Sequence, residues 1–234
     1  MRITSDASDN NGSPSSIRLA TERDADQVAA IYAPNVTDSI ISFELEPPTA
    51  HQMRRRLQDT LQHYPWLVCE RQGRVLGYAY AGAHGSRAAY QWSVDVSVYV
   101  HQQAHRRGVG RALYTSLFAA LKLQGFYNAY AGATLPNPAS VGLHESVGFR
   151  AVGVYRGVGY KLGGWHEVVW WHLPLRERAA EPDPPADLAW VLGSKGWEAR
   201  KARGDRRRRR DHYPPRRLVQ SSTPGDLTAG GWGC

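Results

Sequence analysis

The stretch Val98–Leu121, VYVHQQAHRRGVGRALYTSLFAAL, decides the fold because its apolar period changes in the middle. Through Val100 the apolar residues alternate as in a strand, whereas Leu113, Leu117 and Leu121 recur with the spacing of a helix. Between them lies a cationic, glycine-rich segment. Glycines where a strand passes into a helix leave backbone amides free at the positive end of the helix dipole, an arrangement that binds phosphate. The alternative is a tight turn whose arginines face water.

Outward from this stretch, the apolar periods predict strand, helix, helix, three strands, helix, strand, helix and two strands. This order is a mixed α/β fold, with too few helical crossovers for a doubly wound parallel sheet. The other segments are, in order, SIRLA (16–20), a helix over 21–32, a helix opened by the capping-box pair Thr49 and Gln52, WLVCERQGRVLGYAYAG (66–82) around a Gln-Gly turn, the strand Tyr90–His101, FYNAYAGA (126–133), NPASVGLHESVGF (137–149), and two Gly- and Trp-rich strands that end at Leu175.

The two ends of the chain show no such period. The opening MRITSDASDNNGSPSS is polar, with neither a signal peptide nor a membrane span, and we expect a disordered leader over 1–16. From residue 179 the chain is rich in proline, glycine and charge, including the run Arg206–Arg210, and we expect a disordered basic tail over 179–234. One domain is therefore predicted over 17–178. Two cysteines in unlike contexts favour a reduced, cytoplasmic protein.

A carboxylate lies in the middle of the predicted strand Tyr90–His101. Its even positions are apolar, while Asp95 shares the opposite face with Ser97 and Tyr99. Aspartate is unfavourable in strands, so a functional site is favoured here, with a solvated sheet face as the alternative. The nine histidines form no HxH or HExxH pair, and we expect no metal site.

The segment HRRGVGRALY (105–114) resembles the pyrophosphate-binding signature of the Gcn5-related N-acetyltransferase (GNAT) superfamily, an Arg/Gln-x-x-Gly-x-Gly/Ala loop that holds acetyl-CoA. The chain departs from it with His105 at the first position. Further motifs resemble phosphinothricin N-acetyltransferases and their methionine sulfoximine or sulfone relatives, over about residues 17–175. These motifs are YPWLVCE (64–70), GYAYAG (77–82), LYTSL (113–117), LPNPASVGLHESVGF (135–149) and GGWHEVVWWHL (163–173).

The resemblance implies an acyl-CoA N-acyltransferase fold, whose splayed central sheet is flanked by helices and admits acetyl-CoA between two parallel strands. Pantetheine is then expected to pair with strand backbone just before the glycine loop, where ordinary core packing of the valines is the alternative. The predicted acetyl-CoA residues are Val98, Tyr99, Val100, His105, Arg106, Arg107, Gly108, Val109, Gly110, Arg111, Asn137 and Ser140. Local structure alone also explains Asn137, as a helix N-cap.

The resemblance further implies direct acetyl transfer to the α-amine of a small amino-acid-like acceptor, with Asp95 and His144 as the catalytic residues. The family has a glutamate as general base where Asp95 stands. Because aspartate is one methylene shorter, we expect a water relay there. A polar position on an amphipathic helix is the alternative for His144.

The segment AHGSRAAY (83–90) resembles the acceptor-binding segment of these enzymes, although Gly85 and Ser86 stand where relatives carry a lysine. Arg87 could hold an acidic group bidentately, with an exposed turn arginine as the alternative. The predicted acceptor-binding residues are Phe43, Arg87 and Tyr90.

Other functions stay open at the level of sequence. One is acetylation of another amine, such as a polyamine or a peptide N-terminus, and another is a CoA-binding module whose basic tail binds nucleic acid. Nucleic acid is expected only at the tail, and no membrane is expected. Relatives imply a homodimer and a role in antibiotic or herbicide resistance. The tryptophans Trp165, Trp170 and Trp171 could pack against a partner or the core.

Overall fold

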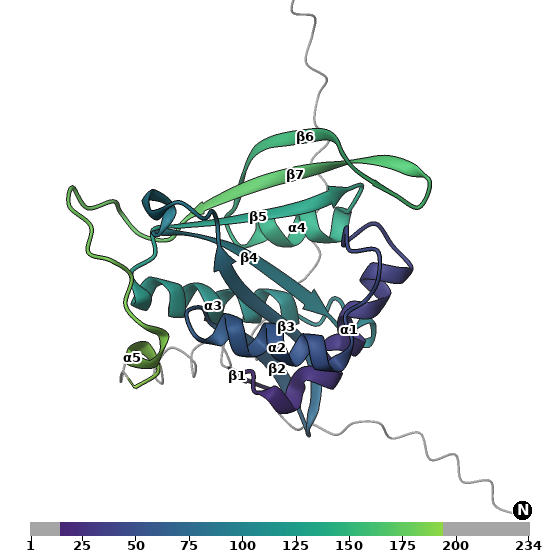
Figure 1. The fold of residues 1–234 in the computed structure, drawn as a ribbon, viewed down its shortest axis with the longest axis horizontal. Helices are drawn as coiled ribbons and strands as arrows, with labels where there is room; N and C mark the ends of the chain where they lie inside the picture. Colours follow the sequence, from purple (N-terminus) through teal and green to yellow (C-terminus); the bar gives the residue numbers. More distant parts are fainter. Residues whose placement is uncertain (1–14, 194–234) are drawn as a thin grey trace, which may run out of the picture.

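A computed structural model describes residues 15–193 of the chain (Figure 1). Its elements follow the predicted order, which confirms the mixed α/β class, and short 3-10 turns and one C-terminal helix are added. The elements are β1 Ser16–Leu19, η1 Glu22–Asp24, α1 Ala25–Thr37, α2 Ala50–Leu61, β2 Trp66–Arg71, β3 Arg74–Ala83, η2 Ala88–Tyr90, β4 Ser93–Val100, η3 Gln102–Ala104, α3 Val109–Gln124, β5 Asn128–Leu135, α4 Pro138–Ser146, β6 Arg150–Lys161, β7 Gly164–Pro174 and α5 Leu188–Leu192.

The described strands form one sheet in the order β1-β2-β3-β4-β5-β7-β6. Neighbours pair antiparallel except β4 and β5, which are parallel. Their pairing covers only Ser93–Asp95 against Asn128–Tyr130, and beyond these residues the strands diverge (Figure 1). The expected splay of the central sheet is therefore present.

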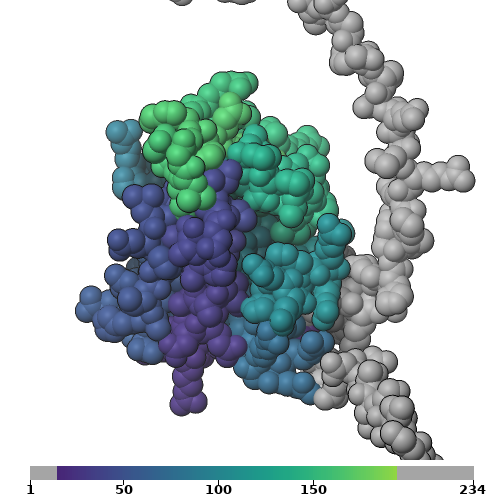
Figure 2. Space-filling view, turned by 90° about the vertical axis from the view of Figure 1, so that its right-hand side faces the viewer, coloured from purple at the N-terminus to yellow at the C-terminus, as the bar shows by residue number. Residues whose placement is uncertain are grey.

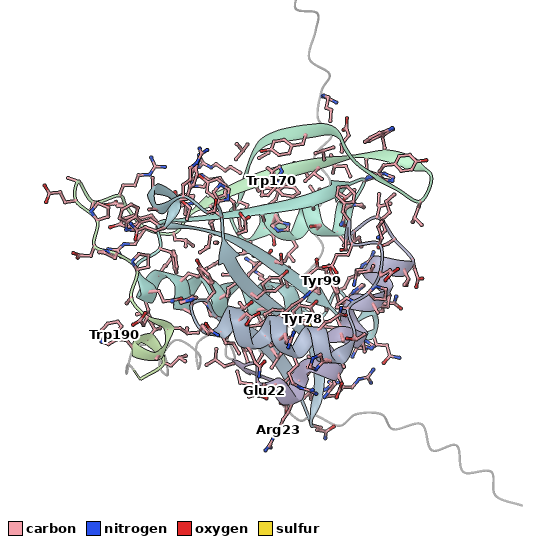
Figure 3. The ribbon with its side chains drawn as sticks, in the orientation of Figure 1. Glu22, Arg23, Tyr78, Tyr99, Trp170 and Trp190 are labelled. Carbon is pink, nitrogen blue, oxygen red and sulfur yellow. The ribbon has the colours of Figure 1, made fainter. Side chains whose placement is uncertain are left out.

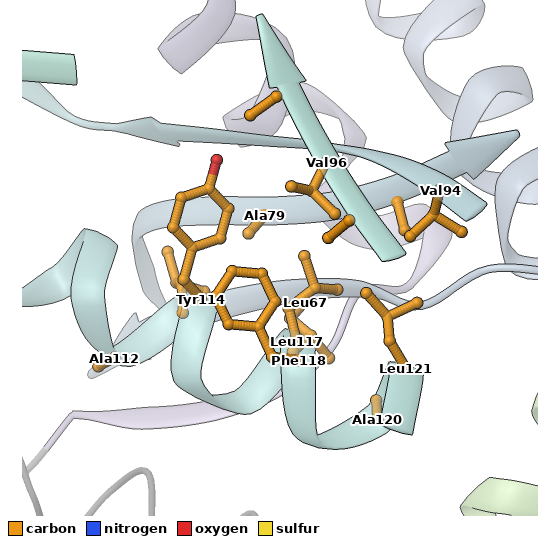
Figure 4. Packing of buried hydrophobic residues seen from close by; sticks show 14 of the residues in the cluster. Leu67, Ala79, Val94, Val96, Ala112, Tyr114, Leu117, Phe118, Ala120 and Leu121 are labelled. Atoms are coloured by element: carbon orange, nitrogen blue, oxygen red, sulfur yellow. The ribbon is translucent and has the colours of Figure 1, made fainter. Parts of the chain in front are cut away.

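Helices α3 and α4 cover one face of the sheet. The leucine stripe of α3, Leu113, Leu117 and Leu121, is fully buried against Val94 and Val96 of β4 (Figure 4). Burial of each such leucine stabilises the fold by about 1.5–3 kcal/mol. This packing fixes α3, and with it the loop at its N-terminus, beneath the diverging strands.

Helices α1 and α2 cover the opposite face, over a layer of aromatic rings. Tyr78 of β3 stacks on Tyr99 of β4 with ring centroids 5.3 Å apart (Figure 3). Tyr32 of α1 meets Tyr99 edge-on, and Trp66 stacks on Tyr80. Because Tyr99 and Asp95 occupy alternate positions of one strand, both belong to this face.

A buried lysine ties the outer hairpin β6–β7 to the segment after α1. Lys161 is 5% exposed, and its ammonium donates to the carbonyl oxygens of Val36 and Ser42, each over 2.6 Å. A Cβ at Gly159 would lie 2.4 Å from the ring of Phe43, so a larger residue there would displace this ring. The tip of the hairpin consequently lies against this segment (Figure 2).

The predicted tail begins at residue 179, and residues 179–193 of it are described. The indole of Trp92 donates to the carbonyl oxygen of Asp183. The backbone amide of Ala186 donates to the carbonyl oxygen of Gln124. Leu188 and Val191 of α5 are buried. The sequence analysis did not predict this helix, because five residues are too few to show a period. The predicted leader covers 1–16, and its last residue, Ser16, begins β1. Residues 1–14 of the leader and residues 194–234 of the predicted tail, with its arginine run, lie outside the described residues.

Candidate active site

The gap between β4 and β5 is the central feature of the site. After Asp95, residues 96–100 of β4 pair with β3 on one side only, whereas on their β5 side no strand of residues 15–193 pairs with them. Val98, Tyr99 and Val100 lie in this part of β4, as predicted. Their unpaired backbone groups can take an extended ligand as an additional strand would be taken. Packing of the two valines against the core, the alternative from sequence, is present as well.

The glycine loop ends at the N-terminus of α3, on the wide side of the gap. Gly108 caps this helix with a φ of 75°, and a Cβ there would meet no atom within 4 Å. The amides of residues 109–111 begin the helix and have no carbonyl partner among the described residues. Gly110 has another role, because a Cβ there would lie 3.0 Å from Leu143 of α4. The loop thus offers free amides to an anion, and Gly110 keeps the two helices close.

The loop carries three exposed arginines and a histidine that contacts the backbone of β4. Arg106, Arg107 and Arg111 are exposed. Arg107 lines a cavity of about 360 Å³ together with Arg71, Arg74 and His101, beside the β2–β3 turn. His105 contacts the carbonyl oxygen of Val100 over 2.9 Å and so ties the loop to the end of β4.

Helix α4 places three predicted residues in one hydrogen-bonded chain. The side chain of Asn137 accepts from the amide of Ser140, as expected of an N-cap. Nδ1 of His144 lies 2.7 Å from the carbonyl oxygen of Ser140, and Nε2 lies 3.0 Å from the hydroxyl of Tyr114. His144 is 4% exposed and stacks on Trp171. Its two ring nitrogens are therefore both occupied within the core.

The two predicted catalytic residues lie on opposite faces of the sheet. His144 packs with Trp171 on the α3 side, whereas Asp95 alternates with the core valines Val94 and Val96 and points to the other side. Its register partner on β5 is Tyr130. The structure therefore separates Asp95 from His144, and the shared catalytic role stays a prediction.

Asp95 has a partner that the sequence analysis missed. Nδ1 of His84 lies 2.7 Å from a carboxylate oxygen of Asp95, and the two side chains are 28% and 40% exposed. Burial raises the pKa of the Asp95 carboxyl, although the hydrogen bond from His84 acts in the opposite direction. The contact depends on the loop geometry between β3 and β4, which no sequence period reports. The only signal was a histidine directly after a strand.

The ring of His84 is held by aromatic neighbours. It stacks on Tyr130 with centroids 4.2 Å apart and planes 16° apart, and Tyr130 stacks in turn on His172 of β7. Tyr90 meets His84 edge-on at 5.9 Å. A Cβ at Gly82, the register partner of Asp95 on β3, would meet no atom of the described residues within 4 Å. Open space thus lies beside this cluster.

The predicted acceptor-binding residues separate into two groups. Tyr90 belongs to the His84 cluster, and Arg87 is exposed three residues before it, at the start of η2. A Cβ at Gly85 would lie 2.8 Å from the Tyr90 ring, so this ring occupies the space that a longer side chain needs. Phe43 packs instead on Gly159 and near His166 in the outer hairpin. Its role in acceptor binding stays a prediction.

The described residues offer neither a metal site nor a membrane-spanning helix. Residues 15–193 contain no group of three or more histidine, cysteine, aspartate or glutamate residues that could hold a metal ion. Within the same range, no helix is long and apolar enough to cross a bilayer.

Comparisons with known proteins identify the family of the chain. Residues 17–170 match the family model of the acetyltransferase (GNAT) domain. The chain is 41% identical over 173 residues to a phosphinothricin N-acetyltransferase of Streptomyces viridochromogenes, covering 72% of this chain and 94% of that protein. It is 32% identical over 170 residues to an L-methionine sulfoximine/L-methionine sulfone acetyltransferase of Pseudomonas aeruginosa, covering 71% and 98%.

A solved structure is similar in three dimensions. It is a GNAT superfamily phosphinothricin acetyltransferase from Sinorhizobium meliloti in complex with acetyl-CoA, with a TM-score of 0.69, 31% identity, and coverage of 73% of this chain and 94% of that one. The family match spans the diverging strands, the glycine loop and helix α4. The chain therefore belongs to the GNAT family of N-acetyltransferases, enzymes whose acetyl donor is acetyl-CoA.

Proposed function

We propose that this enzyme acetylates the α-amine of a small amino acid whose side chain ends in a polar tetrahedral head, as in phosphinothricin, methionine sulfoximine and methionine sulfone. The observation that carries the proposal is the position of residues 84–90. This segment brings Tyr90 and His84 to Asp95, at the point where β4 and β5 part. Two relatives that match about 70% of the chain are named for acceptors of this class.

The donor side of the proposal uses the gap and the glycine loop. Pantetheine pairs with the backbone of Val98, Tyr99 and Val100 on the edge of β4 that faces away from β3, where His105 already contacts the carbonyl oxygen of Val100. The pyrophosphate accepts from the amides of residues 109–111. Arg106 and Arg111 add positive charge at the loop. The predicted contacts of His105, Arg107, Gly108, Asn137 and Ser140 with acetyl-CoA belong to the same proposal.

The acceptor side uses the 84–90 segment. Arg87 meets a carboxylate or the polar head of the acceptor, and Tyr90 forms a wall of the site. Because the ring of Tyr90 occupies the space beside Gly85, no cation extends from that position. The less anionic sulfone and sulfoximine should therefore be used at least as well as phosphinothricin.

The chemical step requires a proton acceptor, because an ammonium nitrogen has no lone pair to attack a thioester. The His84–Asp95 pair provides it in this proposal. Acetyl-CoA supplies the activated acetyl group when bound. The products are an N-acetyl amino acid and CoA.

The proposal is tested by thiol release at a fixed acetyl-CoA concentration. The panel contains methionine sulfone, methionine sulfoximine, phosphinothricin, common amino acids, a polyamine and a short peptide. We expect the highest kcat/KM for the sulfone or the sulfoximine. Activity confined to the polyamine or the peptide contradicts the acceptor class. Tight CoA binding with no thiol release in the presence of any of these acceptors contradicts acetyl transfer to every compound of the panel.

A homodimer through the outer hairpin is a second part of the proposal. Strand β6 lies at the edge of the sheet, and its residues are almost all exposed. Edge strands with apolar side chains pair readily with another chain. Exposed apolar residues of the hairpin are Val152, Val154, Tyr155, Val158, Tyr160, Leu162 and Trp165. Trp171, by contrast, is a core residue.

Sedimentation velocity tests the dimer. The double variant Val152→Lys/Val158→Lys should sediment as a monomer if the hairpin is the interface, because charges on an edge strand oppose pairing. Lys122→Glu, on the far end of α3, serves as the surface-charge control. Equal sedimentation of wild type and the double variant contradicts the interface.

A cytoplasmic location and a role in resistance complete the proposal. Acetyl-CoA is available inside the cell. Acetylation removes the free amine of phosphinothricin-type compounds, which favours detoxification of such compounds.

A further inference from the structure

We propose that His84, rather than Asp95, takes the proton from the acceptor amine, and that Asp95 is a positioning residue that orients the imidazole. The proposal rests on acetyl transfer to an amine, which the family establishes, and deepens the site described for it. The carboxylate and the imidazole are 2.7 Å apart at the last pair of residues that joins β4 to β5.

The hydrogen bond determines which nitrogen of His84 can act. The carboxylate of Asp95 can only accept, so Nδ1 carries the hydrogen and donates it. In the neutral ring Nε2 then bears the lone pair. Among the described residues Nε2 has no hydrogen-bond partner, and the side chain is partly exposed. The free basic nitrogen of the pair is therefore on His84.

The aromatic neighbours keep this nitrogen in one place. Tyr130 lies flat against one side of the His84 ring, and Tyr90 meets the ring edge-on. The titratable groups that face His84 are thus Asp95 from β4, Tyr130 from β5 and Tyr90 from η2. Only Asp95 brings a negative charge, which stabilises the imidazolium that forms when Nε2 takes a proton.

The position of Asp95 explains why it is less suited to act directly. Its carboxylate is engaged by His84 and lies within the paired part of the sheet, where β3 and β5 flank it. Because Nδ1 of His84 contacts the carboxylate, Nε2 lies farther from Asp95 by the width of an imidazole ring. The open space beside Gly82 leaves room next to the pair for the amine.

Proton transfer to His84 precedes the attack on the thioester. The ammonium nitrogen gives one proton to Nε2 of His84, which becomes imidazolium, and the free lone pair attacks the thioester carbonyl carbon. A C–N bond forms and the C–S bond then breaks. The second proton that nitrogen loses ends on the sulfur of CoA, and His84 releases its proton to water. No oxidant or further reactant is needed.

The experiment compares two substitutions at His84. His84→Gln keeps an N–H donor for Asp95 but cannot take a proton at this position, and His84→Ala leaves space for added imidazole. We expect both to lower kcat roughly 10²–10⁴-fold while the Kd for acetyl-CoA is kept. Imidazole should restore a large part of the turnover of His84→Ala, and substituted imidazoles should restore it in the order of their basicity. A purely structural role would give no such order.

The matched control is His172→Gln. It removes the other imidazole that stacks on Tyr130, and its turnover should stay within about threefold of wild type. Rates are measured with the acceptor that wild type acetylates fastest, so an error in the proposed acceptor class leaves the test of His84 intact. Turnover of His84→Gln near that of wild type overturns the inference. So does a folded, CoA-binding His84→Ala that imidazole does not restore.

Discussion

The hydroxyl of Tyr114 donates a hydrogen bond to Nε2 of His144 over 3.0 Å, in the core between α3 and α4. The direction follows from Nδ1, which donates to the carbonyl oxygen of Ser140. Desolvation lowers the pKa of His144 below its usual 6.5, although the hydrogen bond with Ser140 opposes this shift. A neutral imidazole is therefore part of the packed core.

The first prediction concerns the stability of this buried pair. His144→Phe keeps a ring against Trp171 but leaves the Tyr114 hydroxyl without its acceptor. The free energy of unfolding should fall by about 1–3 kcal/mol at pH 7.5, the cost of a buried polar group that loses its partner. Urea denaturation of wild type and variant measures it.

The loss of unfolding free energy in His144→Phe should depend on pH. The pKa of His144 is lower in the folded than in the unfolded chain, so below pH 6.5 the unfolded chain binds more protons. In wild type, the stabilisation by the neutral His144 ring is therefore complete above pH 6.5 and is lost as the pH falls. The variant lacks this stabilisation at every pH. The penalty of His144→Phe should shrink at pH 5.5. A penalty independent of pH would mean that His144 is not buried in its neutral form.

The second prediction concerns the glycine loop. Gly108 and Gly73 both have a φ of 75°, and in both a Cβ would meet no protein atom within 4 Å. Alanine at either position should cost about 1–2 kcal/mol of stability through backbone strain. Only Gly108→Ala should also raise the Kd for acetyl-CoA, by roughly tenfold or more, because its Cβ stands where phosphate oxygens approach the amides. If calorimetry gives the same change in the Kd for acetyl-CoA in both variants, this loop is not the phosphate-binding site.

Sequence periods predicted the fold well because each element carries its own signal. The alternation of Val94, Val96 and Val98 and the stripe of Leu113, Leu117 and Leu121 are set by burial on one face, and the structure buries these residues or packs them against the core. The Thr49–Gln52 capping box is local and is present as predicted.

Residue periods did not predict the side-chain contacts between elements that are distant in the sequence. His84 meets Asp95 because a loop returns the chain to the sheet, and Lys161 meets Val36 across more than a hundred residues. The burial of His144 was likewise not predictable from the sequence. Its motif indicated catalysis, but only the packing of α4 on Trp171 reveals that the ring is buried. Side-chain partners across a sheet depend on register and loop length, which residue periods do not report.

The third prediction concerns the C-terminal segment. A chain that ends after Arg178 loses the contact of Ala186 with Gln124 and exposes the surface that Leu188 and Val191 cover. Burial of these two side chains is worth about 1.5–3 kcal/mol each, so the melting temperature should fall by roughly 6–24 °C. A chain that ends after Gly193 is the matched control and should melt like the full chain. Equal melting of both truncations would show that the segment does not pack on the domain.

The last prediction concerns Arg87 and the acceptor. If the guanidinium holds the carboxylate or the head group, Arg87→Ala removes a charge-assisted hydrogen bond worth about 1.5–3 kcal/mol. The KM for the preferred acceptor should then rise roughly 10–100-fold, with little change in kcat and none in the Kd for acetyl-CoA, because the lost contact is made equally in the ground and transition states. Arg23→Ala, another exposed arginine, in η1 (Figure 3), is the matched control and should leave the KM unchanged. The rise should be smaller for an acceptor whose carboxylate is amidated, if that carboxylate is the group Arg87 holds. An unchanged KM in Arg87→Ala would exclude this arginine from the acceptor site and leave Tyr90 and the His84–Asp95 pair as its polar groups.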